Sequence, residues 1–171
     1  VPRGTKVEID LAVAEARRAF DHGPWPKFSP RERKEHLLKF ANKIEEQYNR
    51  LTSAFSKIKK LKINYAAKAL TNISILKFIN KLGAGLDTVS IQEVKLGLHA
   101  GFKAENIIYT PNGVSLDEIE EVVKLKVQIN IDSLYMLEQF GSKHPTTPVC
   151  IRINPHIMAG GNTNISVGHI D

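Results

Sequence analysis

Residues 62–72 read Lys62-Ile63-Asn64-Tyr65-Ala66-Ala67-Lys68-Ala69-Leu70-Thr71-Asn72, and the pattern of the chain changes there. The apolar run predicts a short strand that delivers Lys68 at its carboxyl end, with a helix starting soon after it. Ligands of α/β folds bind at the carboxyl ends of strands, and a partly desolvated lysine amine is a nucleophile toward carbonyl groups. Position alone favours a simpler alternative, a lysine whose ammonium reaches water.

Beyond residue 62, short apolar strands alternate with amphipathic helices. We expect strands at residues 63–67, 86–89, 106–110, 127–131 and 149–153. Helices are expected at residues 73–82, 91–100 and 133–140, and from the Ser115 cap, completed by Glu118 as a capping box, to Val123. This alternation is typical of parallel βαβ units. The sequence therefore predicts an α/β fold with about five βα units of a partial (β/α)8 barrel, or an opened parallel sheet.

The part before residue 62 has the pattern of two helices. An apolar stripe of Ile9, Val13, Ala16 and Phe20 predicts a helix over residues 7–21. A second, long helix should start at Ser29-Pro30-Arg31-Glu32, with an N-cap, a proline and an acidic residue in order, and end near Ile58. We divide the chain into residues 1–5, interpreted as a purification-tag remnant, a helical segment (6–58) and an α/β segment (59–171).

Composition excludes several classes of protein. The 171 residues are 42% hydrophobic and 25% charged, which is typical of a globular protein of one domain, or one domain with an appendage. No apolar run has membrane-spanning length and no signal peptide is recognisable. The single Cys150 cannot form an internal disulfide and fits a reducing compartment, so we expect a cytoplasmic protein.

The net charge of +6 is concentrated at the front of the chain. Residues 1–62 carry 15 Lys and Arg against 8 Asp and Glu, whereas residues 63–171 carry 9 against 10. A basic segment can bind nucleic acid. However, the positive residues alternate with carboxylates at helical spacing, as in Arg31-Glu32-Arg33-Lys34-Glu35, which is more typical of a solvated helix face. We therefore keep a nucleic-acid-binding module only as an alternative.

Several separate blocks of the α/β segment resemble the diaminopimelate decarboxylases. In order they are Tyr65-Ala66-Ala67-Lys68-Ala69, Leu82-Gly83-Ala84-Gly85-Leu86-Asp87-Thr88-Val89-Ser90, Glu93, Ala100-Gly101-Phe102, Tyr109-Thr110-Pro111-Asn112-Gly113 and Arg152-Ile153-Asn154-Pro155. The resemblance runs from near Ile44 to the last residue. It implies a barrel that binds pyridoxal phosphate (PLP) and decarboxylates meso-diaminopimelate to lysine.

The resemblance also implies site residues. Lys68 matches the Schiff-base lysine, Asp87 a carboxylate near the cofactor, and Arg152 a residue that faces the cofactor region. Alternatives stay open: Asp87 could cap the helix that follows it, and Arg152 could pair with a neighbouring carboxylate. His144 is interpreted as a surface loop residue. No group of His, Cys, Asp and Glu has metal-ligand spacing, so no metal site is expected.

A complete barrel has eight strands, and only five are recognisable in residues 62–153. In the family, later strands bring a histidine against the cofactor ring, a glycine-rich phosphate site and an acid for the pyridine nitrogen. We therefore expect no bound cofactor, or PLP at Lys68 if any, and no efficient decarboxylation by this chain.

Residues 6–44 resemble an N-terminal helical stretch of aldehyde dehydrogenases. The similarity rests on the run from Ile9 to Asp21, on Gly23-Pro24-Trp25-Pro26 and on Ser29-Pro30-Arg31-Glu32-Arg33. Both similarities meet within one helix, around Asn42–Glu46. Our leading interpretation is an engineered chimera of two enzyme fragments, made or selected for folding. The alternative is a truncated diaminopimelate decarboxylase that retains weak PLP binding.

A five-stranded piece would leave strand edges open, and open edges pair with other chains. The added helices could cover the gap, two copies could associate, or the sheet could lie flat between helices. We expect a homo-oligomer that forms through strand edges or swapped helices, with no membrane partner.

Overall fold

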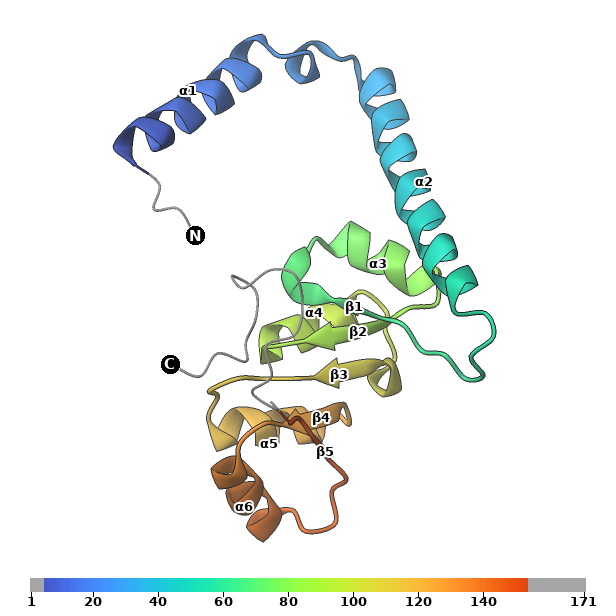
Figure 1. The fold of residues 1–171 in the computed structure, drawn as a ribbon, viewed down its shortest axis with the longest axis vertical. Coiled ribbons are helices and arrows are strands. Elements are labelled where there is room, and N and C mark those ends of the chain that lie inside the picture. The colour runs from blue at the N-terminus through green and yellow to red at the C-terminus, as the bar shows by residue number, and fades with distance from the viewer. Residues whose placement is uncertain (1–4, 154–171) are drawn as a thin grey trace. The chain divides into compact units, whose positions relative to one another are not determined.

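The structure, a computed structural model, describes residues 5–153 and divides the chain into two compact units, Val1–Ala54 and Phe55–Asp171 (Figure 1). The first unit holds helix α1 (Lys6–His22), the 3-10 turn η1 (Trp25–Lys27) and helix α2 (Pro30–Ala54). Reciprocal bonds between Ser29 and Glu32 confirm the predicted start of the long helix. It ends at Ala54, before Ile58, because the backbone turns at Phe55, whose carbonyl accepts a hydrogen bond from Ile58 N.

None of the described residues 5–54 is buried. The predicted apolar stripe of α1 lies open, with Val13 63% and Phe20 69% exposed. The helices are supported by local interactions: a capping box between Thr5 and Glu8, and ion pairs along each helix such as Arg31 with Glu35. The charged residues thus form the solvated face that their spacing predicts.

Within its described residues, 55–153, the second unit is built on five parallel strands. They are β1 (Asn64–Ala66), β2 (Gly85–Thr88), β3 (Ile107–Tyr109), β4 (Gln128–Ile131) and β5 (Cys150–Ile151). The strands lie in the order β1-β2-β3-β4-β5, and every neighbouring pair is parallel (Figure 1). Successive strands of a (β/α)8 barrel have this order. The predicted α/β fold with about five βα units is therefore confirmed.

Helices connect these strands, and each has a polar cap. They are α3 (Ile73–Lys81), α4 (Ile91–His99), α5 (Leu116–Lys124) and α6 (Leu134–Lys143), with 3-10 turns η2 (Ala67–Ala69) and η3 (Ala104–Asn106). The caps are Asn72, Ser90, Ser115 and Ser133 in turn. The prediction of a capping box at Ser115 is wrong in one detail. The Glu118 carboxylate accepts from Ile91 N and from the Tyr109 hydroxyl, which tie it to neighbouring elements.

The core lies between the helices and one face of the sheet. Strand residues alternate between the two faces, so every second one points into this core. Its fully buried members include Leu76, Leu86, Val94, Ile107, Tyr109, Ile119, Val122, Ile129, Ile131 and Phe140. Gly97 brings α4 close to the sheet: a Cβ there would lie 2.5 Å from Leu86 Cδ2. Burying each Leu or Ile contributes roughly 1.5–3 kcal/mol, so this core fixes the positions of the strand ends.

The opposite face of the sheet is half-buried and more polar. Asp87, Thr110 and Asn130 lie on it, near the carboxyl ends of their strands. No helix among residues 5–153 is both long enough and apolar enough to cross a membrane.

Candidate functional site

The carboxyl ends of all five strands meet along one edge of the sheet. Lys68 lies in η2 directly after β1, Asp87 lies within β2, and Arg152 follows β5. The ladder continues to Arg152, whose backbone N donates to Ile131 O at 2.8 Å. The structure thus brings all three predicted residues to the edge where α/β folds bind ligands. We call Lys68, Asp87, Thr110, Asn130 and Arg152 the carboxyl edge.

Lys68 projects from a tight turn instead of from the strand itself. Ala66 is still extended, and Leu70 N donates to Ala67 O at 3.0 Å, which closes the turn. The Lys68 side chain is exposed. Among the described residues no carboxylate lies within 4.0 Å of its amine, so the amine is accessible to a small aldehyde.

Asp87 is paired with Ala66 across β1 and β2, so it lies on the strand next to Lys68. Its Oδ1 accepts a hydrogen bond of 2.9 Å from the Thr110 hydroxyl, and Thr110 Oγ1 accepts one of 3.0 Å from Asn130 Nδ2. The hydrogen bonds therefore run across β2, β3 and β4. The alternative that Asp87 caps the next helix is wrong, because Ser90 provides that cap.

Asn130 leaves one atom unsatisfied. Its Oδ1 is buried, and no hydrogen-bond partner for it is present among the described residues. An unsatisfied buried acceptor costs about 1–3 kcal/mol, and such groups are rare enough to need an explanation. Sequence reasoning missed both Asn130 and Thr110. Both lie at the carboxyl ends of predicted strands, and Thr110 also falls in one of the blocks that resemble the decarboxylases, so these were the signals that could have found them.

Arg152 is exposed and lines a pocket of about 440 Å³ with residues of β4, β5 and α6. A second pocket of about 340 Å³ lies between the ends of β3 and β4 and includes Asn130. No carboxylate of the described residues lies within 4.0 Å of the Arg152 guanidinium. Three strand spacings, about 14 Å, separate Arg152 from Asp87. The two residues thus share the carboxyl edge without touching.

Below the carboxyl edge, the buried Tyr109 is hydrogen-bonded to the half-buried Glu118. The Tyr109 hydroxyl donates to Glu118 Oε1 at 2.6 Å and so joins β3 to α5. Burial, and secondly the hydrogen bond to Glu118, raise the pKa of Tyr109 well above its usual range. The phenol therefore stays neutral and remains a donor.

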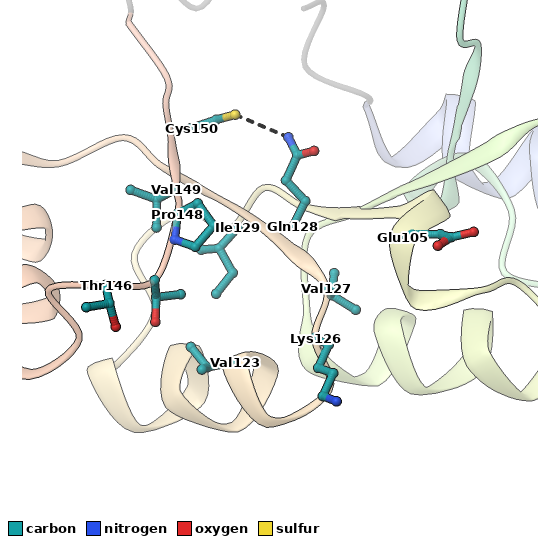
Figure 2. A pocket seen from close by; sticks show the side chains of 11 residues that line it. Glu105, Val123, Lys126, Val127, Gln128, Ile129, Thr146, Pro148, Val149 and Cys150 are labelled. Atoms are coloured by element: carbon teal, nitrogen blue, oxygen red, sulfur yellow. Dashed lines mark hydrogen bonds between the residues drawn. The ribbon is translucent and has the colours of Figure 1, made fainter.

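A larger pocket, of about 640 Å³, lies at the opposite ends of the strands (Figure 2). It is formed by the starts of β4 and β5, the end of α5 and the loop at residues 146–149. Gln128 Nε2 donates to Cys150 Sγ at 3.2 Å across its rim (Figure 2). Ligands of α/β folds bind at the other ends of the strands, so the carboxyl edge is the better candidate site. Among residues 5–153 no cluster of His, Cys, Asp and Glu could hold a metal ion.

Comparison with known proteins finds sequences similar to this chain. The diaminopimelate decarboxylase of Methanothermobacter thermautotrophicus is 34% identical over 128 residues, which are 74% of this chain and 30% of that protein. The Helicobacter pylori enzyme is 37% identical over 135 residues, 74% of this chain and 32% of its own length. The chain therefore spans about a third of the length of the curated relatives it matches.

Solved structures of decarboxylases are also similar to this chain. The crystal structure of the Helicobacter pylori diaminopimelate decarboxylase with L-lysine has a TM-score of 0.66 at 35% identity, over 75% of this chain and 34% of that chain. The ornithine decarboxylase of Entamoeba histolytica, at 23% identity and a TM-score of 0.55, covers 64% of this chain and 34% of its own, and shares the fold. Residues 41–171 match the family "Pyridoxal-dependent decarboxylase, pyridoxal binding domain", and the chain belongs to this family.

Proposed function

We propose that this chain carries part of the PLP-binding domain of a diaminopimelate decarboxylase, and that Lys68 holds the cofactor. The observation that carries the proposal is the position of Lys68. Its exposed amine follows β1 directly, at the carboxyl edge and beside the strand of Asp87. Both residues fall inside the range that matches the pyridoxal-binding family.

The residues of the carboxyl edge fit the chemistry of this cofactor. PLP presents an aldehyde, a phosphate and a basic ring nitrogen, and so needs an amine, cationic groups and hydrogen-bonding partners. Lys68 supplies an amine, Arg152 a guanidinium and Asp87 a carboxylate, while Asn130 Oδ1 is a buried acceptor without a donor in the described part of the chain. The donor set at this edge therefore suits an anionic aldehyde better than it suits a metal ion.

Each residue has a distinct proposed role. Lys68 would bind the aldehyde covalently through its amine and so anchor the ligand at the end of β1. The Asp87 carboxylate, held by Thr110, would favour a positively charged group beside it. Arg152, in its pocket beyond β5, would bind an anionic group such as a phosphate or a carboxylate. When bound, the cofactor supplies an electron sink for the electrons that remain when a carboxylate leaves as carbon dioxide.

The proposed substrate class comes from the relatives. They are named for decarboxylation of diaminopimelate, and three solved structures hold L-lysine. We extend this class to the present chain: an α-amino acid with a second ammonium group on its side chain. Histidine and glycine-rich elements that the resemblance places on later strands would be needed for turnover, so cofactor binding at Lys68 is the first step to test.

The test is a titration of the chain with PLP, followed by the visible absorbance of the protein-bound cofactor. We expect saturable binding that is lost in Lys68→Ala. Lys62→Ala is the matched control, because Lys62 lies at the other end of β1, where its amine donates to Glu105 O at 2.9 Å. Equal absorbance from both variants would overturn the proposal, since it would show that any exposed amine reacts.

The origin of residues 6–40 is a separate question, because they lie outside the matched range. Their similarity to aldehyde dehydrogenases and the interpretation of the chain as an engineered chimera stay predictions. The comparisons support the alternative, a portion of a diaminopimelate decarboxylase, better than they support a chimera made for folding.

A further inference from the structure

The hydrogen bonds of Asp87, Thr110 and Asn130 have a defined direction. A hydroxyl has one hydrogen to donate, and an ionised carboxylate only accepts. The Thr110 hydrogen must therefore go to Asp87 Oδ1, as the 2.9 Å contact allows. Thr110 Oγ1 then accepts from its other neighbour, so Asn130 presents its amide nitrogen, 3.0 Å away. The charge on Asp87 thus sets the orientation of two side chains on neighbouring strands.

The orientation of Asn130 explains its unsatisfied atom. With Nδ2 toward Thr110, Oδ1 points away from it and is buried without a donor among residues 5–153. A network with a purely structural role would be expected to satisfy this acceptor, because buried polar groups are hydrogen-bonded almost everywhere in proteins. The unsatisfied acceptor, with its free-energy cost, lies at the carboxyl edge, beside a pocket of about 340 Å³ that Asn130 helps to line.

We propose that Thr110 and Asn130 are positioning residues that hold the Asp87 carboxylate in one orientation at the carboxyl edge. Thr110 acts directly, by its hydrogen bond to Asp87. Asn130 acts through Thr110: its amide donates to the Thr110 hydroxyl oxygen, so that the hydroxyl hydrogen remains directed at the Asp87 carboxylate. The inference rests on the proposed function in one respect: the positively charged group that the Asp87 carboxylate would face is part of bound PLP.

We call the hydrogen bonds that lead from Asn130 through Thr110 to Asp87 the relay. It can be tested without any cofactor, by NMR of the Asn130 side-chain amide in the ¹⁵N-labelled chain. We expect Asp87→Asn to shift this signal although the two residues share no contact, because the donor direction through Thr110 is then no longer fixed. Thr110→Val should shift it and speed its exchange with water, and Thr110→Ser should restore it. Asp117→Asn is the control, since Asp117 is an exposed aspartate in the first turn of α5.

The second readout is the affinity for PLP. Thr110→Val should weaken binding about tenfold, as expected for a lost hydrogen bond to a charged group, whereas Thr110→Ser should bind like the parent chain. Asn130→Asp offers Thr110 a competing carboxylate and should weaken binding to a similar extent. In an Asp87→Asn background, Thr110→Val should have no further effect, which a general loss of packing would not produce.

The two proposals fail in different ways. The relay would be overturned if the Asn130 amide signal were unchanged by Asp87→Asn. It would also be overturned if Thr110→Val weakened PLP binding equally with and without the Asp87 charge. Loss of PLP binding in Lys68→Ala would stand regardless of that result. Conversely, an Asn130 signal that follows Asp87 in a chain that does not bind PLP would support the relay and contradict the proposed function.

Discussion

The fold opposes the ionisation of Tyr109. This residue is fully buried, and its hydroxyl donates to Glu118. Its pKa is raised from the ordinary value of 10.0, by burial first and then by Glu118. A raised pKa means that the folded state keeps the proton longer than the unfolded chain does. The stabilisation is therefore full below about pH 10 and is lost as the pH rises above it.

Replacing Tyr109 with phenylalanine tests whether the phenol causes this loss of stability above pH 10. We expect the free energy of unfolding of the parent chain to fall above pH 10 by up to about 1.4 kcal/mol per pH unit more than that of Tyr109→Phe. Urea unfolding at a series of alkaline pH values gives the comparison. Tyr135→Phe is the control, since Tyr135 is 70% exposed. Identical alkaline slopes for Tyr109→Phe and the parent would contradict the buried, carboxylate-bonded phenol.

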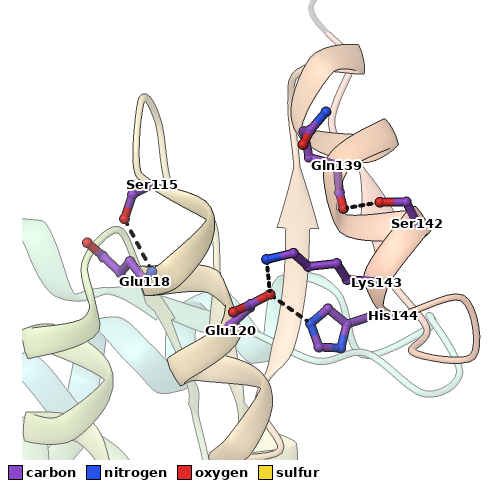
Figure 3. A network of polar contacts seen from close by, with 7 residues as sticks. All are labelled: Ser115, Glu118, Glu120, Gln139, Ser142, Lys143 and His144. Carbon is purple, nitrogen blue, oxygen red and sulfur yellow. Dashed lines mark hydrogen bonds and ion pairs between the residues drawn. The ribbon is translucent and has the colours of Figure 1, made fainter.

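At the scale of elements, α5 and α6 are joined through one carboxylate. Glu120 of α5 lies 3.1 Å from the Lys143 amine and 3.3 Å from His144 Nε2, both at the end of α6 (Figure 3). The His144 ring also stacks on Phe140, with centroids 4.9 Å apart. His144 lies just after the last residue of α6, in the loop where it was expected, and its side chain is half-buried there.

The Glu120 cluster predicts an acid-sensitive contact between these helices. Hydrogen bonds from Lys143 and then His144 lower the pKa of Glu120 below its ordinary value of 4.5. A lowered pKa stabilises the fold fully above pH 4.5, and this contribution is lost as the pH falls through the lower, folded-state value. Glu120→Gln should lower the melting temperature at neutral pH, and the difference should disappear in acid. Glu138→Gln, an exposed change on α6, should show no such pH dependence, and a constant difference for Glu120→Gln would contradict the cluster.

Element order was predictable, because most apolar runs are followed within a few residues by a Gly, Pro, Ser or Asn that ends one element or caps the next. The residues at which the elements end were less predictable. The first strand was expected to reach Ala67, but the backbone tightens into η2 there, so Lys68 lies on a turn. Thr110 and Asn130 escaped prediction for a different reason. Their contact with Asp87 depends on the register of β2, β3 and β4, which no local pattern in the sequence specifies.

At the scale of the whole molecule, we propose that copies of the chain associate through strand edges. In the described sheet β1 and β5 are the outer strands, and Ile151 of β5 is 61% exposed. An exposed apolar edge strand pairs readily with another strand, and a lysine on it opposes pairing. Ile151→Lys should therefore shift the mass in solution, measured by sedimentation, toward the monomer. Ile153→Lys, just beyond the strand, is the control and should not; a parent chain that sediments as a monomer would contradict the proposal.

The central claim is that the fold presents Lys68 as the cofactor amine, and the most direct measurement is to trap it. The chain is incubated with PLP, reduced with borohydride, digested and mapped by mass spectrometry. We predict that the label concentrates on the peptide containing Lys68, although Lys57, Lys59 and Lys60 are also exposed. A label spread evenly over these exposed lysines, with no preference for Lys68, would contradict the account.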